Sequence, residues 1–193
     1  TIETIVFVVV MVVIIRFFLG EIRWIPSASM HPTLLEGDRI FVERLSRFYS
    51  SPERGDIMVF YPPFEEIKTD ALSIFSRLTG FFCKDIAYIK RVVGMPGDKL
   101  EIKKDSGGEY HVFINDKALD EPYILSDTDY IPCSGEMYCG PMKIPAGHYF
   151  MMGDNRGNSQ DSRFWGLLPK ERMIGRAVVL FWPLDRVDYF GRA

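Results

Sequence analysis

The N-terminal segment of the chain is apolar on every side. Residues 5–15 are eleven consecutive apolar side chains, Arg16 interrupts the run, and residues 17–19 extend it. A membrane-spanning helix needs about 20 apolar residues, so length alone does not distinguish a membrane helix from a buried strand. The β-branched side chains would suit a strand, but so long an apolar run is unusual for a strand of a soluble domain.

Three interpretations of this segment compete. A cleavable signal peptide needs small residues and a cleavage site after the apolar run, and residues 20–22 form a poor one. A core element would be apolar on one face and polar on the other. A membrane anchor fits best, leaving the bilayer near Leu19 or Trp24, with Arg16 reaching the headgroups and Trp24 at the interface. We therefore predict an anchor over residues 1–23.

The chain begins with Thr1 rather than Met. We expect part of the anchor, or its cytosolic flank, to precede it. Without that flank the Lys and Arg residues on the cytosolic side cannot be counted, so the positive-inside rule does not set the orientation of the anchor.

Beyond Trp24 the pattern changes to short β segments between turns. Residues 39–43 and 56–61 each follow a Gly-Asp turn signal and alternate or run apolar, which predicts two strands. Residues 70–82 carry apolar side chains at a helical period, which predicts a short helix at the surface, at the membrane interface or against the sheet. Further strands are predicted at residues 86–94, 99–102, 110–114, 149–152 and 177–182.

Residues 105–145 are rich in Gly, Pro, Ser and Asp, which predicts a loop-rich β insertion between two parts of one β domain, residues 24–104 and 146–193. No internal repeat is evident. The predicted fold class is therefore mainly β and antiparallel, with an N-terminal transmembrane helix and a small inserted subdomain of ribbon and loop.

Composition narrows the class of protein. The 193 residues are 47% hydrophobic and 14% aromatic, so the chain can bury a core without help from disulfides or metals. The net charge is −3 and no basic stripe stands out, so we expect no nucleic-acid partner. The histidines, His31, His111 and His148, are scattered and form no ligand spacing, so we expect neither a metal nor a cofactor.

Two of the three cysteines, Cys133 and Cys139, lie close together in a loop rich in Gly and Pro. A local disulfide is one interpretation if the domain lies outside the cytosol, and two unrelated loop thiols are the other. In the first case Cys83 remains free.

Lys90 stands in an otherwise apolar, β-prone run, residues 86–94. On a strand, Lys90 shares one face with Tyr88 and Val92 while Arg91 points the other way, so one of the two cations is directed among apolar neighbours. A lysine in mid-strand is usually a surface charge or protects a sheet edge. The functional interpretation is that burial lowers its pKa, so that the neutral amine acts as a general base.

Ser29 lies in a segment rich in Pro and Ser, residues 25–34. Serines in such segments usually form turns. A serine needs a base before it can attack a carbonyl, and Lys90 supplies one in the Ser/Lys variant of the catalytic triad. The Ser27 hydroxyl, beside the Ser29 N–H, is a candidate donor to a developing oxyanion. His31 is the rival base, but a histidine base usually comes from elsewhere in the chain and needs an orienting carboxylate.

Residues 153–166 are dense in turn formers and charges. One interpretation is a polar turn in which Asp154, Arg156, Asp161 and Arg163 pair among themselves. The functional interpretation adds Ser159 as the partner that orients Lys90, with Asp161, Arg163 and Asp154 supporting the site from behind. No Gly-x-Ser-x-Gly motif holds a serine here, which argues against an α/β-hydrolase.

At these residues the chain resembles the bacterial type I signal peptidases, the membrane-anchored Ser/Lys leader peptidases. The resemblance covers about residues 14–185, and the five motifs in this order are highly specific. They are residues 26–34, 37–40, 54–60, 88–98 and 153–166. Two departures are mild: Ala28 stands where the family commonly has Gly, and the anchor is short and single where some members have two.

The resemblance implies that Ser29 is the nucleophile, Lys90 the general base, Ser27 an oxyanion donor and Ser159 the positioning partner of the lysine. It also implies shallow pockets for small side chains, as in an Ala-x-Ala cleavage site. The family positions that line such pockets match Ile25, Met30, Leu34, Tyr88 and Ile89. Cys133 and Cys139 echo a disulfide loop that some members have.

The resemblance further implies a monomeric, single-pass protein of the bacterial cytoplasmic membrane, with its catalytic domain on the extracytoplasmic side. An organellar membrane, such as the thylakoid, stays open as an alternative. Its partners would be the lipid bilayer and preproteins that carry signal peptides. Two alternatives stay open: another Ser/Lys maturation peptidase, and a membrane-tethered β module that has lost activity. A self-cleaving repressor is disfavoured because no pair of DNA-binding helices precedes the site.

Overall fold

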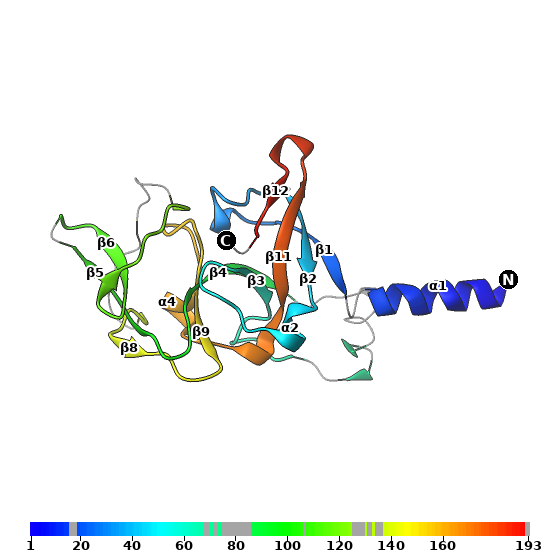
Figure 1. Cartoon of the computed structure of the whole chain (residues 1–193), viewed down its shortest axis with the longest axis horizontal. Helices are drawn as coiled ribbons and strands as arrows, with labels where there is room; N and C mark the ends of the chain where they lie inside the picture. Colours follow the sequence, from blue (N-terminus) through cyan, green and yellow to red (C-terminus); the bar gives the residue numbers. More distant parts are fainter. Residues whose placement is uncertain are drawn as a thin grey trace.

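Two antiparallel sheets form the body of the molecule (Figure 1). The structure is a computed structural model that describes residues 1–15, 19–67, 70, 71, 73, 74, 86–105, 107–124, 130, 133 and 137–191. Within these residues, eight strands form the larger sheet in the order β1-β2-β11-β3-β4-β9-β10, with β12 paired to β11. Four strands form the smaller sheet in the order β7-β6-β5-β8. The mainly β, antiparallel fold predicted from the sequence is confirmed.

The elements have the following bounds. The larger sheet comprises β1 (Gly20–Trp24), β2 (Arg39–Glu43), β3 (Ile57–Phe60), β4 (Tyr88–Gly94), β9 (His148–Met152), β10 (Leu168–Pro169), β11 (Met173–Trp182) and β12 (Asp188–Tyr189). The smaller sheet comprises β5 (Lys99–Lys104), β6 (Tyr110–Ile114), β7 (Lys117–Ala118) and β8 (Met142–Lys143). The helices are α1 (Ile2–Ile14), α2 (Ser46–Tyr49) and α4 (Ser162–Trp165), and the 3-10 turns are η2 (Ala28–Met30), η3 (Lys170–Arg172) and η4 (Leu184–Arg186).

Alternation along β4 directs its side chains into different parts of the core. Ile89 packs with Ile57 and Val59 of β3 in a cluster that also holds Met30 of η2. Val92, on the opposite face, packs in a second cluster. Because β4 is packed on both faces, a side chain that it carries has a fixed position.

The predicted anchor, residues 1–23, extends too far along the chain. Its last four residues, 20–23, belong to strand β1, which pairs with β2 in the larger sheet. Buried Glu21 forms an ion pair with Arg44 at 2.9 Å, which explains how a charged residue directly after an apolar run takes its place in the sheet.

Strand β11 begins at Met173, four residues before the predicted strand at 177–182. Strand propensity does not predict this part of β11, because glycine, here Gly175, is disfavoured in strands. The structure requires glycine there: a Cβ on Gly175 would lie 2.2 Å from the carbonyl oxygen of Glu43 on β2. Close approach of two strands therefore outweighs local preference.

The predicted insertion, residues 105–145, corresponds to the smaller sheet, but that sheet starts earlier. Strand β5 at Lys99–Lys104 belongs to it, because Leu100 and Ile102 pack with Val112 and Ile114 of β6. Most of the helix predicted at 70–82 lies outside the described residues, as does Cys83.

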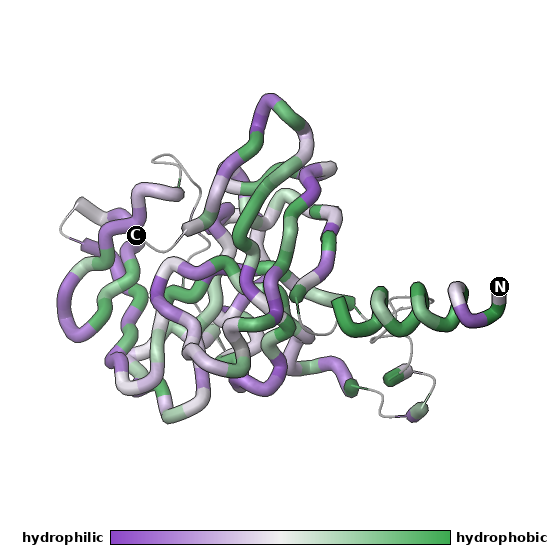
Figure 2. Tube along the Cα trace, turned by 45° about the vertical axis from the view of Figure 1, so that its right-hand side comes forward, coloured by the Kyte–Doolittle hydropathy of each residue, from purple (hydrophilic) through white to green (hydrophobic). Residues whose placement is uncertain are grey.

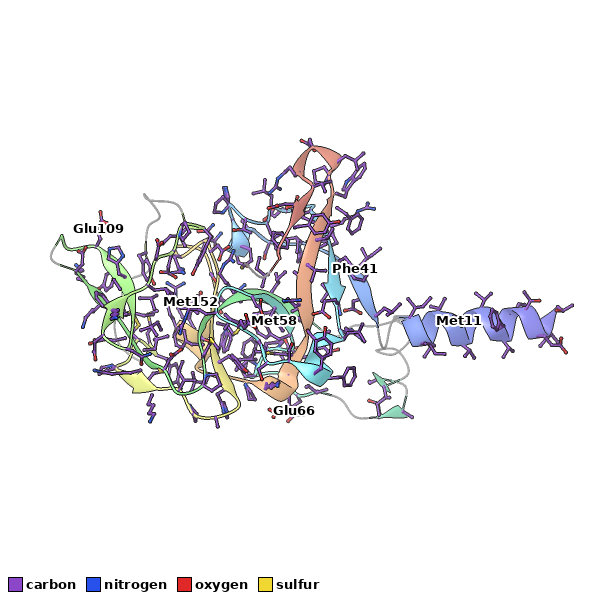
Figure 3. The ribbon with its side chains drawn as sticks, in the orientation of Figure 1. Met11, Phe41, Met58, Glu66, Glu109 and Met152 are labelled. Carbon is purple, nitrogen blue, oxygen red and sulfur yellow. A yellow bond between two sulfur atoms is a disulfide. The ribbon has the colours of Figure 1, made fainter. Side chains whose placement is uncertain are left out.

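Helix α1 extends away from the sheets, and none of its residues is buried. Figure 2 shows it as an almost uninterrupted apolar segment, and Figure 3 shows its side chains, Met11 among them, standing clear of the β domain. In the described part of the chain, no helix has both the length and the apolar character that crossing a membrane requires.

Candidate active site

Lys90 lies in the middle of β4 with its side chain inside the protein. Its register partner on β3 is Met58, and the whole residue is only 4% exposed. The amine Nζ lies 2.7 Å from Ser29 Oγ and donates to the main-chain oxygen of Ile89 at 2.9 Å. The two residues that the sequence singled out, 61 positions apart, are therefore in direct contact.

Ser29 is held in η2, the short turn that follows β1. The loop that follows β9 is tied to this turn, because Asn155 donates from its main-chain N–H to the Ser29 carbonyl at 3.2 Å. The Asn155 side-chain amide donates to the carbonyl of Ala28 at 3.1 Å. Ser27 precedes the turn, and its Oγ lies 3.3 Å from Ser29 Oγ, so a second hydroxyl stands beside the first.

Burial lowers the pKa of Lys90 from its ordinary value of 10.5 to about 8, because a charged amine is poorly solvated inside the protein. The carboxylates of Asp161 and Asp154 oppose this shift, and the Arg163 guanidinium supports it. A substantial fraction of the amine is consequently neutral just above neutral pH. A neutral amine 2.7 Å from a hydroxyl can accept its proton.

Ser159 lies at the back of the site, but the predicted hydrogen bond to Lys90 is not formed. Its Oγ is buried and, among the described residues, has no hydrogen-bond partner. Gly153 separates Ser159 from the nucleophile: a Cβ on Gly153 would lie 2.4 Å from the Ser29 carbonyl and 2.3 Å from Ser159 Oγ. The Lys90 amine donates to Ser29 Oγ and to the main-chain oxygen of Ile89 instead.

The charges of residues 153–166 do not all pair among themselves. Asp161 and Arg163 do, through two contacts of 2.8 Å, and Asp161 also accepts from the Gly153 N–H at 3.1 Å. Asp154 instead binds Arg91 of β4, at 2.8 Å from Nε, and accepts from Thr33 Oγ1 at 2.6 Å. These bonds attach the loop to β4 and to the segment after Ser29.

Arg156 takes its partner from the insertion. The guanidinium is fully buried and binds Glu121, with 3.0 Å from Nη1 to Oε2, and the Tyr130 hydroxyl at 3.1 Å. Its Nε donates to the carbonyl of Gly153 at 3.0 Å. The insertion thus contacts the loop that packs against Ser29. Glu121 was missed by the sequence analysis, because one acid in a polar loop carries no local signal.

A cleft of about 350 Å³ opens over the Ser29–Lys90 pair. Of the residues predicted to bind substrate, Tyr88 and Ile89 line it. The other three predicted pocket residues, Ile25, Met30 and Leu34, are 2%, 0% and 0% exposed and belong to the core. Their apolar side chains pack in the hydrophobic core instead of lining the cleft. The cleft is completed by Pro26, Ser27, Ile86, Ala87, Asn158 and Gln160.

Two further predicted features have clear positions. Cys133 and Cys139 are joined by a disulfide bond.

Among the described residues, His31 forms no side-chain hydrogen bond to Ser29, whose hydroxyl contacts Lys90 and Ser27. Nor does any group of three or more His, Cys, Asp or Glu side chains in the described ranges have an arrangement that could hold a metal ion.

The arrangement suits covalent catalysis of acyl transfer. It has a hydroxyl nucleophile, a buried amine within proton-transfer distance of it, and a second hydroxyl near the point where an oxyanion would form. The cleft leaves one side of this group open to a peptide.

Comparison with known proteins identifies the family. The family described as "Signal peptidase, peptidase S26" matches residues 1–182. A signal peptidase I from Leptolyngbya laminosa is 43% identical over 190 residues, which are 98% of this chain and 82% of that protein. A probable signal peptidase I-2 from Synechocystis sp. is 41% identical over 185 residues, covering 96% and 73%.

Among solved structures, a signal peptidase I from Enterococcus faecalis aligns with a TM-score of 0.46 and 25% identity, covering 66% of this chain and 97% of that one. The family match spans nearly the whole chain, and the relatives are similar over most of their own length. The chain belongs to the signal peptidase family, peptidase S26, and is a serine endopeptidase of the family that removes signal peptides.

Proposed function

We propose that this protein removes N-terminal signal peptides from exported preproteins with a Ser29–Lys90 dyad. The observation that carries the proposal is the 2.7 Å contact between the buried Lys90 amine and the Ser29 hydroxyl. An ordinary lysine is protonated at neutral pH and cannot act as a base, whereas burial brings the pKa of Lys90 to about 8.

In the first half of the reaction, neutral Lys90 takes the proton of the Ser29 hydroxyl while Oγ attacks the carbonyl carbon of the scissile peptide bond. The carbonyl oxygen becomes an oxyanion, which the Ser27 hydroxyl and the Ser29 N–H stabilise. Lys90 then gives its proton to the nitrogen of the leaving amine. The C–N bond breaks, the mature protein leaves, and the signal peptide stays attached to Ser29 as an ester.

In the second half, Lys90 takes a proton from a water molecule, and the resulting hydroxide attacks the ester carbonyl. The bond to Ser29 Oγ breaks and Oγ recovers a proton from Lys90. The free signal peptide leaves with a new carboxyl group. Each step uses the same amine alternately as base and acid, which a pKa close to the working pH allows.

The cleft supports binding of an extended substrate with small side chains. Ser27 follows β1, and Ile86 and Ala87 precede β4, so both segments lie outside the strand ladders. A peptide laid along them would add a strand, with main-chain hydrogen bonds for affinity and pockets for alternate side chains. Tyr88 and Ile89 leave only a small cleft near Ser29, which favours cleavage after residues such as alanine, as in Ala-x-Ala.

Helix α1 supports attachment to a membrane. Its apolar residues other than Val13 are exposed, from 39% for Met11 to 81% for Ile2, and in water such a surface would be unfavourable. The sequence continues apolar to Leu19, apart from Arg16. We place α1 in the bilayer as a single anchor, with the β domain on the extracytoplasmic side of the bacterial cytoplasmic membrane. A monomer acting there meets preproteins as they emerge.

The test is cleavage of a peptide with an Ala-x-Ala site by the full chain in detergent micelles. Wild type should cut after the second alanine, whereas Ser29→Ala and Lys90→Ala should each lose at least a thousandfold in kcat while keeping the fold. Lys117→Ala, at an exposed position of β7, is the matched control and should stay fully active. Cleavage by either dyad variant at the wild-type rate would refute the catalytic role of the dyad. A wild-type protein that does not cut the peptide would refute the proposed cleavage at Ala-x-Ala sites.

A further inference from the structure

Asn158 and Gln160 stand on either side of buried Ser159. Ser159 is 4% exposed, and both neighbours are exposed, so the side chains of the three residues alternate between interior and surface. Both exposed residues line the cleft over the dyad. Their positions are set by the loop behind them, which is tied to Ser29 through Asn155 and to the core through Asp161.

The two walls of the cleft differ in chemistry. One is largely apolar and consists of Ile86, Ala87, Tyr88 and Ile89. The other presents the two side-chain amides, and among the described residues no hydrogen bond joins either amide to the protein. Each amide has two N–H donors and one carbonyl acceptor, the same groups that a peptide bond needs as partners.

The two walls come from different segments of the chain. The loop at residues 153–160 is attached to the carbonyl of Ser29, because Asn155 binds that oxygen and Gly153 packs against it. The apolar wall belongs instead to the segment that leads into Lys90, and Ser27 precedes Ser29 in the chain with its hydroxyl beside that of Ser29. If a peptide runs along the apolar wall up to Ser29, the polar wall is the part of the cleft lining left for the residues after the scissile bond.

We propose that the side-chain amides of Asn158 and Gln160 bind the main chain of the residues that follow the scissile bond, the first residues of the mature protein. The inference rests on the proposed peptidase function. The amide oxygen accepts from a substrate N–H and the amide nitrogen donates to a substrate C=O, so the mature end is recognised without regard to its side chains.

Recognition of side chains before the scissile bond and of the main chain after it suits an enzyme that cuts many different preproteins. Side-chain pockets at the apolar wall select the small residues before the cut, where the substrates share chemistry. Beyond the cut the substrates share only their main chain, and side-chain amides are suited to binding it. Recognition there also holds the leaving amine in place while Lys90 protonates it.

The experiment compares amide and ester peptides. One substrate is an Ala-x-Ala peptide, and its partner has an ester oxygen in place of the N–H of the second residue after the scissile bond. Products are identified by mass spectrometry. On the all-amide peptide, Asn158→Ala and Gln160→Ala should each lower kcat/KM roughly threefold to tenfold, the effect of one lost hydrogen bond. Lys117→Ala should have no effect.

The ester should lower kcat/KM of the wild type by a similar factor, and at least one of the two alanine variants should lose little more on it, since the same bond is already absent. Equal further losses on both peptides in both variants would overturn the inference, and so would unchanged kinetics in both. Coupling only to an ester placed before the scissile bond would also overturn it. Failure of the proposed function looks different, because Ser29→Ala would then still cleave.

Discussion

Replacing Lys90 with methionine tests the energetic cost of the buried amine, because methionine keeps a straight side chain and removes the titrating nitrogen. Burial holds the pKa of Lys90 at about 8, against 10.5 for an ordinary lysine. A change of one in pKa corresponds to about 1.4 kcal/mol, so charged Lys90 lowers the stability of the folded protein by about 3 kcal/mol.

The pH dependence follows from the proton count in each state. Below pH 8 Lys90 is protonated in both the folded and the unfolded state, and the folded state bears the full cost. Between pH 8 and 10.5 the folded state has lost the proton while the unfolded state still holds it, so the cost disappears as pH rises. Methionine also loses the contacts to Ser29 and Ile89, which together contribute about 2 kcal/mol at every pH.

Lys90→Met should therefore be about 1 kcal/mol more stable than wild type at pH 7 and about 2 kcal/mol less stable above pH 10.5. The assay is urea unfolding of the full chain in detergent at pH 7, 8, 9 and 10, followed by tryptophan fluorescence. The free energy of unfolding of the wild type is subtracted from that of the variant at each pH. This removes the contribution of the other titrating groups, which both proteins share. Lys117→Met, exposed on β7, is the control and should show a constant difference. A constant difference for Lys90→Met as well would refute the claim that burial depresses the pKa of this amine.

The remaining predictions concern activity and the loop behind the site. kcat/KM should rise with pH and reach half its maximum near pH 8, as Lys90 in the free enzyme loses its proton; a profile flat from pH 6 to 9 would exclude the lysine as base. EDTA should leave the cleavage rate unchanged, because the Ser29–Lys90 reaction needs no metal, and strong inhibition would contradict it. Glu121→Gln should lower the free energy of unfolding by about 3–5 kcal/mol in a urea titration, because buried Arg156 loses its carboxylate. Glu109→Gln, at an exposed position directly before β6, should change it by less than about 0.5 kcal/mol.

Strands that alternate cleanly were predictable from the sequence. The bounds predicted for β2 and β6 match the structure, and those for β3, β4 and β9 differ by one or two residues. Strand β1 was missed because it directly follows an apolar segment whose pattern dominates the window. The two-residue strands, such as β8 and β10, are too short to carry any periodicity.

The contact between Ser29 and Lys90 was also predictable, since each residue stands in a specific motif. The partners of the charged loop were not. Asp154 reaches Arg91 across 63 positions and Arg156 reaches Glu121 across 35, and no local pattern encodes such distances. The same limit explains Ser159: its place at the site follows from the motif, but whether its hydroxyl meets Lys90 depends on the tight packing around Gly153.

Burial depresses the pKa of Lys90, and the ion pairs of the loop explain why the nearby acids do not reverse this effect. Among the described residues, the buried arginines each have a carboxylate partner: Arg44 has Glu21, Arg91 has Asp154, Arg156 has Glu121 and Arg163 has Asp161. Among the same residues, the Lys90 amine hydrogen-bonds a hydroxyl and a main-chain oxygen and lies 5.6 Å from the centroid of the Tyr88 ring, but it has no carboxylate partner. A free carboxylate beside Lys90 would stabilise the charged amine and raise its pKa. Because Asp154 and Asp161 already bind arginines, their pull on Lys90 is partly cancelled, and desolvation prevails. The arginines paired with these acids thus hold the loop in place, and the charge of Arg163 also offsets part of the effect of the acids on the base.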